Sequence, residues 1–382
     1  MRSYVDDGVS LSEHYRLREV IVILPGPLAF NAMIEPSPIA ELPWLGVPLQ
    51  EALRQRRSHA LLVQAAPGDG AVQFVLALAQ GLLCEGGAPP CGECTGCHHV
   101  LARSHPDLYF LVPPALAASL NLAGPADVAA DDDGGSKKKP SKQIQVGAAR
   151  LAIEWAGKTS SRGGLKVVLI HPGESMNQVS GSALLKTLEE PSAGVVMLLS
   201  TADASLLLPT VRSRCQVFLL PPVPQPVALA WLAERINDDA AVLLAAAAGR
   251  PLDALALAQG GVNARAWAGL PAAMAAGQAQ ALAGWSIAAA VDALQKLCHD
   301  TWALAAGAPP RYFAAPTLRT GVGMPALAVW ARNLARVARH DEHPWNEGLL
   351  IEALVCEAQQ TLAPAAPAAV PRERGVGTLV RP

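Results

Sequence analysis

The sequence lacks an excess of charge of either sign, and it lacks a long uninterrupted apolar segment. Its 30 basic and 32 acidic residues give a net charge of −2, so the overall balance does not predict nucleic-acid binding. No apolar run approaches the roughly 20 residues that a membrane-spanning helix needs. The run from Val20 to Phe30 is interrupted by Pro25 and Pro27, unlike a signal peptide. We therefore expect a cytoplasmic protein with no membrane partner.

Charged residues are scarce at 16 %, whereas hydrophobic residues make up 51 % of the chain. This balance is typical of globular domains and leaves little room for disorder. A length of 382 residues predicts two or three domains, each with its own core. Residues 1–40 contain no motif, so we expect a loose extension that arises from translation starting upstream of Met33. The Pro- and Ala-rich composition of residues 363–382 predicts a disordered tail.

Two short apolar runs separated by a helix form the clearest pattern in the chain. Lys166–Ile170 and Val195–Leu199 are too short for helices and predict strands buried on both faces. Between them, Ser182 is expected to cap a helix that ends at Pro191. Strand, helix and strand in this order predict a parallel α/β sheet.

Another predicted strand, Ala60–Val63, precedes a glycine-containing turn and a largely buried helix. Strand, turn and helix support a phosphate-binding loop, whose chemistry also needs a lysine for the phosphates and a hydroxyl for Mg²⁺. The turn runs through Gly68 and Gly70 and continues with Ala71 and Val72. Because the lysine and the hydroxyl are both missing from the sequence, we expect a degenerate loop that binds no ATP.

Four of the seven cysteines follow one another with the spacing C-x6-C-x2-C-x2-C. Four thiolates complete a closed tetrahedral zinc shell, which leaves no position for a reacting water. The predicted role is therefore structural; redox thiols or a disulfide pair are the alternatives, and His98 and His99 are competing ligands. The four predicted ligands are Cys84, Cys91, Cys94 and Cys97.

The rest of the chain divides by composition. Residues 113–142 are rich in Pro, Ala, Asp and Gly and carry short opposed charge runs, which predicts a solvated loop. A proline-rich linker begins at Pro221, and no convincing strand pattern lies beyond it. We therefore expect a small helical domain over residues 222–262 and a second all-helical domain over residues 263–362.

Together these motifs resemble the delta-prime subunits of the clamp loader of bacterial DNA polymerase III, which belong to the AAA+ family. The resemblance covers residues 44–362 by architecture. It implies an AAA+-like α/β domain over residues 41–221 with an inserted zinc module at 84–97, then a helical lid and a helical collar. Its specific part is the cysteine module with four segments, His59–Leu62, His105–Asp107, Ala183–Pro191 and Arg212–Cys215.

Three departures distinguish the chain from the motor subunits of that family, gamma/tau, which share its zinc module. The motor pattern has Gly-Lys-Thr where this chain has Gly70-Ala71-Val72, and an acidic Asp-Glu pair where it has His171-Pro172. The helical arginine of the motor pattern falls at Leu252, and Arg250 lies two positions early. Three parts of one ATPase mechanism are missing together. The resemblance therefore implies a subunit with no ATPase activity of its own.

The segment Ser213-Arg214-Cys215 carries the implied function. In the family, its arginine reaches the ATP bound by the neighbouring subunit, and a guanidinium presents a charged planar fork to phosphate oxygens. The resemblance thus implies that Arg214 is an arginine finger acting in trans. From the residues alone, a surface or capping arginine is the alternative.

The resemblance implies a subunit that helps to load the sliding clamp on primed DNA within the DNA polymerase III holoenzyme. Motor (gamma/tau) and delta subunits are the implied partners, and one structural Zn²⁺ is the implied metal. Two other readings stay open: an active gamma/tau-type ATPase, and a zinc-bearing nucleic-acid-binding protein. Tight ATP binding by the isolated chain favours the first, and steeply salt-dependent affinity for primed DNA favours the second.

Overall fold

The computed structural model describes residues 41–120, 122, 140–339 and 345–363. These described residues divide into two compact units, one within residues 41–264 and one within residues 265–363. The predicted N-terminal extension and all but the first residue of the predicted tail lie outside the described residues. So does most of the predicted loop over 113–142, including both of its charge runs.

A five-stranded parallel sheet forms the centre of the larger unit, with the strand order β2-β3-β4-β1-β5. Every residue of β3 and β4 is buried, as their continuous apolar sequences predicted. The prediction of a parallel α/β sheet is therefore confirmed. The strands are β1 (Ala60–Gln64), β2 (Leu108–Leu111), β3 (Lys166–Ile170), β4 (Val195–Thr201) and β5 (Gln216–Leu219).

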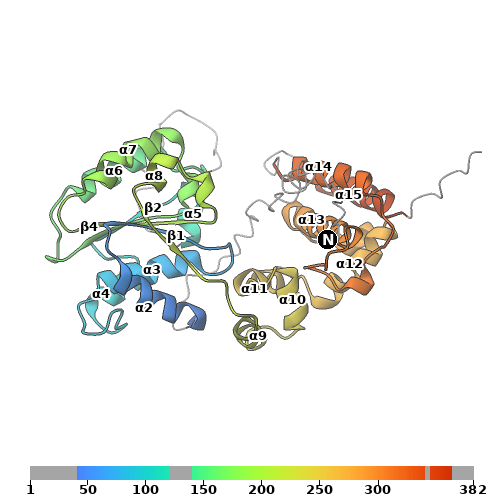
Figure 1. Cartoon of the computed structure of the whole chain (residues 1–382), viewed down its shortest axis with the longest axis horizontal. Helices are drawn as coiled ribbons and strands as arrows, with labels where there is room; N and C mark the ends of the chain where they lie inside the picture. The colour runs from blue at the N-terminus through green and yellow to red at the C-terminus, as the bar shows by residue number, and fades with distance from the viewer. Residues whose placement is uncertain (1–40, 121, 123–139, 340–344, 364–382) are drawn as a thin grey trace, which may run out of the picture. The chain divides into compact units, whose positions relative to one another are not determined.

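Helices cover both faces of this sheet. Figure 1 shows α6 (Val146–Ala156), α7 (Gln178–Glu189) and α8 (Pro209–Arg212) on one face. The other face carries α2 (Gly46–Gln55), α3 (Ala71–Leu82) and α4 (Thr95–Leu101). α3 is buried along most of its length, which explains why its sequence is apolar on all sides.

Two local expectations differ from the structure. α7 is capped by Asn177, whose Oδ1 accepts a hydrogen bond from the Ser180 N–H at 2.9 Å, and not by Ser182. Asn177 offers the same capping chemistry one turn earlier, so Ser182 lies inside the helix. The predicted loop over 113–142 begins with a short helix, α5 (Pro114–Ala117), because proline is favoured in a first helical turn.

Three helices follow the sheet within the same compact unit, α9 (Gln225–Ala233), α10 (Ala240–Ala246) and α11 (Pro251–Gln259). α9 is anchored to the start of the described chain, because the Trp231 indole N–H donates to the Glu41 carbonyl oxygen at 2.6 Å. The Trp231 ring also packs edge-on against Trp44, with 5.2 Å between centroids. The predicted small helical domain therefore shares a compact unit with the sheet.

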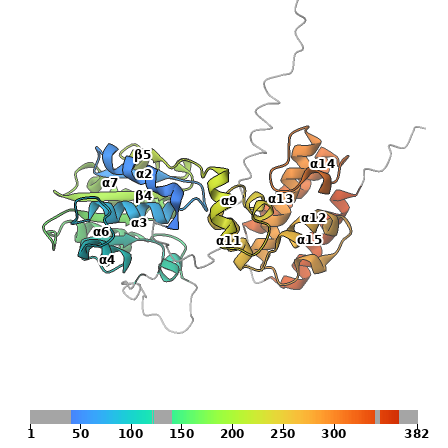
Figure 2. The ribbon, with the colours of Figure 1, turned by 90° about the horizontal axis from the view of Figure 1, so that it is seen from below.

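The described part of the second unit contains helices and no strand, as expected. Figures 1 and 2 show α12 (Ala264–Ala275), α13 (Ile287–Ala305), α14 (Met324–Ala338) and α15 (Glu347–Leu362) gathered together. Trp267 and Trp330 lie in its core. Short 3-10 helices complete the described chain: η2 (Pro43–Leu45), η3 (Ala118–Leu120), η5 (Gly173–Ser175), η6 (Ala204–Leu206), η7 (Ala279–Leu282) and η8 (Ala315–Thr317).

Among the described residues, no individual helix has the length and apolar character to cross a membrane; only the sharply bent pair α10 and α11 passes that test, by length and composition jointly.

Candidate functional site

The loop between β1 and α3 joins a strand to the start of a helix, which is the place of a phosphate-binding loop. Gly68 (φ 79°) and Gly70 (φ 97°) both adopt the left-handed conformation that side chains disfavour. Gly70 is the N-cap of α3, and Ala71 and Val72 form its first positions. Their methyl and isopropyl groups cannot neutralise phosphate charge or hold Mg²⁺. The loop therefore lacks the side chains that a phosphate-binding loop uses.

A carboxylate from α11 lies against this loop. A β-carbon added to Gly68 would lie 2.7 Å from Asp253 Oδ2 and closer still to the other two carboxyl atoms. The Leu252 N–H donates to the Gly68 carbonyl oxygen at 3.2 Å, which holds α11 in place. Arg250 Nε lies 2.8 Å from Asp253 Oδ2, so this arginine is paired within its own helix turn. The carboxylate and its arginine therefore pack against the turn, and Arg250 offsets the charge of Asp253 there.

A second acid of the loop, Asp69, is buried, with 5 % of its surface exposed. Burial raises the pKa of Asp69 to about 6, an effect that Arg250 opposes and Asp253 reinforces. The main chain of Asp69 is fixed as well, because the Trp44 indole N–H donates to its carbonyl oxygen at 2.9 Å. Sequence reasoning missed the roles of Asp69 and Asp253, since local spacing does not show that α11 packs against this loop.

The carboxyl end of β3 carries a neutral side chain where the motor pattern has acids. His171 Nδ1 lies 2.7 Å from Ser200 Oγ, at the end of the neighbouring strand β4. Burial lowers the pKa of His171 to about 4, so its ring is neutral at pH 7. Pro172 follows and offers no side-chain ligand. These two residues supply no carboxylate for Mg²⁺ or for an attacking water.

The four predicted zinc ligands come together at α4. Their sulfur atoms all lie within 4.8 Å of one another. Cys84 Sγ is 4.0 Å from Cys94 Sγ, and Cys91 Sγ is 3.9 Å from Cys97 Sγ. Tetrahedral ligation with Zn–S distances of about 2.3 Å places sulfurs about 3.8 Å apart, whereas a disulfide needs about 2.05 Å. The arrangement fits one tetrahedral metal ion and fits no disulfide.

Main-chain N–H groups surround these sulfurs. The N–H groups of Glu85 and Cys97 donate to Cys94 Sγ at 3.4 and 3.3 Å, and they lower the pKa of Cys94 to about 6. Burial raises the pKa of Cys97 to about 12, an effect that a bound cation would oppose because metal coordination deprotonates a thiol. The competing histidines stay outside the cluster, since His99 Nδ1 instead lies 3.1 Å from Ser104 Oγ.

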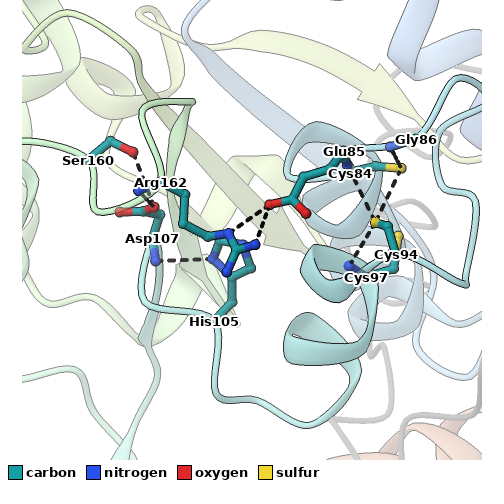
Figure 3. A network of polar contacts seen from close by, with 9 residues as sticks. All are labelled: Cys84, Glu85, Gly86, Cys94, Cys97, His105, Asp107, Ser160 and Arg162. Carbon is teal, nitrogen blue, oxygen red and sulfur yellow. Dashed lines mark hydrogen bonds and ion pairs between the residues drawn. The ribbon is translucent and has the colours of Figure 1, made fainter.

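Polar contacts connect the cysteine module to the sheet (Figure 3). Arg162 Nη2 lies 2.7 Å from Glu85 Oε1, next to the first cysteine. Asp107 accepts hydrogen bonds from the Arg162 N–H at 3.0 Å and from the Ser160 hydroxyl at 3.1 Å. Its own N–H donates to His105 Nδ1 at 3.1 Å. The segment His105–Asp107 therefore positions the turn that precedes β3.

Arg214 lies two residues after α8 and is partly exposed, with 32 % of its side chain accessible. Its Nε donates to Glu189 Oε1 at 2.6 Å, and its Nη2 contacts the same oxygen. Its Nη1 donates to the Thr210 carbonyl oxygen at 2.8 Å. Burial raises the pKa of Cys215 to about 11, which marks that thiol as unreactive. Sequence reasoning did not anticipate Glu189, although it lies in the quoted segment Ala183–Pro191.

Sequence comparison identifies the family. A family model described as "DNA polymerase III, delta subunit" matches residues 48–224. DNA polymerase III subunit delta' of Escherichia coli K12 is 33 % identical over 278 residues, covering 66 % of this chain and 76 % of that protein. The chain belongs to the family of DNA polymerase III delta-prime subunits. The delta-prime subunit of Pseudomonas aeruginosa is 35 % identical over 228 residues, 56 % of this chain and 62 % of that protein.

More distant similarity extends to other subunits of the polymerase. DNA polymerase III subunit tau of Salmonella typhimurium is 33 % identical over 167 residues, which are 43 % of this chain and 22 % of that protein. A crystal structure of a gamma subunit-related protein from Thermotoga maritima covers 84 % of this chain and 99 % of its own, at 14 % identity and a TM-score of 0.41. The strand order, the helical second unit and the family membership confirm the predicted AAA+-like fold class.

Proposed function

We propose that this delta-prime family member is a clamp-loader subunit that helps to load the sliding clamp on primed DNA and hydrolyses no ATP. The observation that carries the second part is the loop between β1 and α3. Its glycines keep the left-handed backbone, but the lysine and hydroxyl are replaced by Ala71 and Val72, and Asp253 lies against Gly68. A loop that offers neither a lysine for the phosphates nor a hydroxyl for Mg²⁺ has little affinity for a triphosphate.

Within the complex, the proposed role of Arg214 is to act as an arginine finger on the ATP of a neighbouring motor subunit. Three features support this role: its partial exposure, its place in the segment Ser213–Cys215, and the permanent charge of a guanidinium. Motor and delta subunits are the proposed partners. The sliding clamp and primed DNA are contacted within the assembled complex, in the cytoplasm.

The proposed cofactor is one structural Zn²⁺ held by Cys84, Cys91, Cys94 and Cys97. Four sulfur ligands close its coordination shell, so the ion would stabilise the module and perform no reaction. Elemental analysis of the purified chain should find about one zinc per chain, and Cys91→Ser should remove it. Four freely titrating thiols in the cluster with no bound metal would contradict the assignment.

The complex reconstituted with motor and delta subunits tests the function. An arginine finger contributes roughly 10³-fold or more to phosphoryl transfer at the site it serves. Arg214→Ala should therefore lower clamp loading by more than about tenfold while the complex still assembles. Arg212→Ala is the matched control, an exposed arginine two residues earlier, and it should leave loading unchanged.

Binding measurements on the isolated chain separate the other two functions. The proposal predicts no saturable ATP binding at millimolar nucleotide. Tight ATP binding that is lost on mutation of residues 65–72 would instead identify an active ATPase. Affinity of the isolated chain for primed DNA, with a steep salt dependence, would identify a nucleic-acid-binding protein.

A further inference from the structure

Arg214 is bound within its own chain in a way that limits its contact with a phosphate. A guanidinium has five N–H donors. Its Nε and Nη2 contact Glu189 Oε1, and its Nη1 donates to the Thr210 carbonyl oxygen at 2.8 Å and to Ser213 Oγ at 3.3 Å. Two parallel N–H groups on one edge are needed for bidentate phosphate recognition. Each edge of this guanidinium already has a partner in the chain.

Glu189 gains nothing from the dipole of its own helix. It is the last residue of α7, where the helix macrodipole disfavours a negative charge. Its side chain is 47 % exposed and lies beside Arg214, which is 25 residues later in the sequence. The contact joins α7 to the end of α8, the two elements that carry the segments Ala183–Pro191 and Arg212–Cys215. Glu189 thus has an electrostatic partner at the proposed finger.

We infer that Glu189 is a positioning residue that holds Arg214 in the free subunit and releases it when the neighbour's ATP site forms. The inference rests on the proposed function of Arg214 as a finger. Solvent-exposed ion pairs contribute little stability, so the contact with Glu189 orients the guanidinium and can still be broken at a small cost in free energy. A triphosphate presents more negative charge to the guanidinium than the single carboxylate of Glu189 does, so the Coulomb attraction favours the exchange in the assembled state.

Release of this kind predicts a specific kinetic effect. Glu189→Gln keeps the side-chain length and removes the competing charge. In the reconstituted complex it should lower the KM for ATP of DNA-stimulated hydrolysis by about 1.5- to 5-fold, the range of an exposed ion pair, with kcat unchanged. Glu190→Gln is the matched control, because Glu190 is the next residue and is also an exposed acid. It should leave both constants unchanged.

A double-mutant cycle and a spectroscopic signal separate this role from a structural one. The effect of Glu189→Gln should vanish in an Arg214→Ala background, since it acts only through the guanidinium. In the free chain, the Arg214 Nε–H NMR resonance should be protected from exchange and should lose that protection in Glu189→Gln, but not in Glu190→Gln. A purely structural role for Glu189 would produce neither the coupling between the two substitutions nor the change in the exchange protection of the Arg214 Nε–H.

The outcomes distinguish the inference from the function beneath it. If Arg214→Ala leaves ATPase and loading unchanged, the proposed finger fails and the functional part of this inference fails with it. A second outcome is that Arg214→Ala lowers ATPase activity and clamp loading, but Glu189→Gln raises the KM or lowers kcat. Glu189 would then stay bound to Arg214 during catalysis, and the inferred release would be wrong. If Glu189→Gln changes neither constant, or acts equally without Arg214, the positioning role is wrong.

Discussion

Gly68→Ala tests the contact between α11 and the degenerate loop. Gly68 has a φ of 79°, and the added β-carbon would lie 2.7 Å from Asp253 Oδ2 and closer to Cγ and Oδ1. The carboxylate must therefore move. Its movement separates it from Arg250 Nε, which lies at 2.8 Å, and disturbs the hydrogen bond between the Leu252 N–H and the Gly68 carbonyl oxygen. We expect the larger unit to lose stability.

The expected loss can be divided into two parts. An alanine in the left-handed region costs about 1–2 kcal/mol. Loss of the Arg250–Asp253 contact adds about 1 kcal/mol, because both side chains are mostly removed from solvent. Loss of the Leu252 hydrogen bond adds about 1 kcal/mol more. Gly68→Ala should thus lower the free energy of unfolding by about 3–4 kcal/mol.

The control is Gly163→Ala, since Gly163 has a φ of 73° and open space around its missing β-carbon. It should show the backbone cost alone, about 1–2 kcal/mol. Urea unfolding followed by tryptophan fluorescence suits the larger unit, where Trp44 packs against Trp231. In an Asp253→Ala background, the cost of Gly68→Ala should fall to that of the control. Equal losses for Gly68→Ala and Gly163→Ala in the unmodified background would refute the contact.

Three further predictions concern titratable side chains that are removed from solvent. The pKa of His171 is lowered from 6.5 to about 4, so the unfolded chain binds more protons than the folded chain between these values. The free energy of unfolding should therefore fall by up to about 3 kcal/mol as the pH falls from 6.5 to 4. His171→Asn should reduce this pH dependence, measured as the urea midpoint at each pH. The pKa of Asp69 is raised from 3.8 to about 6, so its stabilising contribution is lost as pH rises through that window, and Asp69→Asn should remove this loss. Asp300 is fully buried, and its carboxylate accepts hydrogen bonds from the main-chain N–H groups of Arg311, Tyr312 and Phe313. Asp300→Ala should lower the free energy of unfolding of the second unit by about 3 kcal/mol, measured by calorimetry.

The features that sequence predicted correctly depend on local spacing. Buried parallel strands are short continuous apolar runs, so the length and continuity of such runs predict β3 and β4. The cysteine cluster is predictable because Cys-x2-Cys spacing lets neighbouring thiolates face one ion. The helix cap at Asn177 was missed because Ser182 offers the same chemistry within the same segment, and propensity does not choose between them.

The contacts that sequence did not predict join distant segments. Asp253 reaches Gly68 because the chain after β5 returns over the β1–α3 loop, and no periodicity encodes that return. The sequence places Arg250 two positions before the motor arginine, and the structure pairs its side chain with Asp253. Glu189 and Arg214 lie on different helices, so only their packing brings the charges together.

The degenerate loop and Arg214 lie at opposite ends of the same parallel strands. The loop follows the carboxyl end of β1 and His171 follows that of β3, whereas Arg214 precedes the amino end of β5. A five-residue strand such as β1 separates these ends by about 16 Å. The differences from the motor pattern at the loop and at His171-Pro172 therefore lie at one end of the sheet, and the packing beneath α7 and α8 lies at the other. The proposed lack of an ATP site and the proposed action of Arg214 on a neighbour are thus compatible within one sheet, because they depend on opposite ends of its strands.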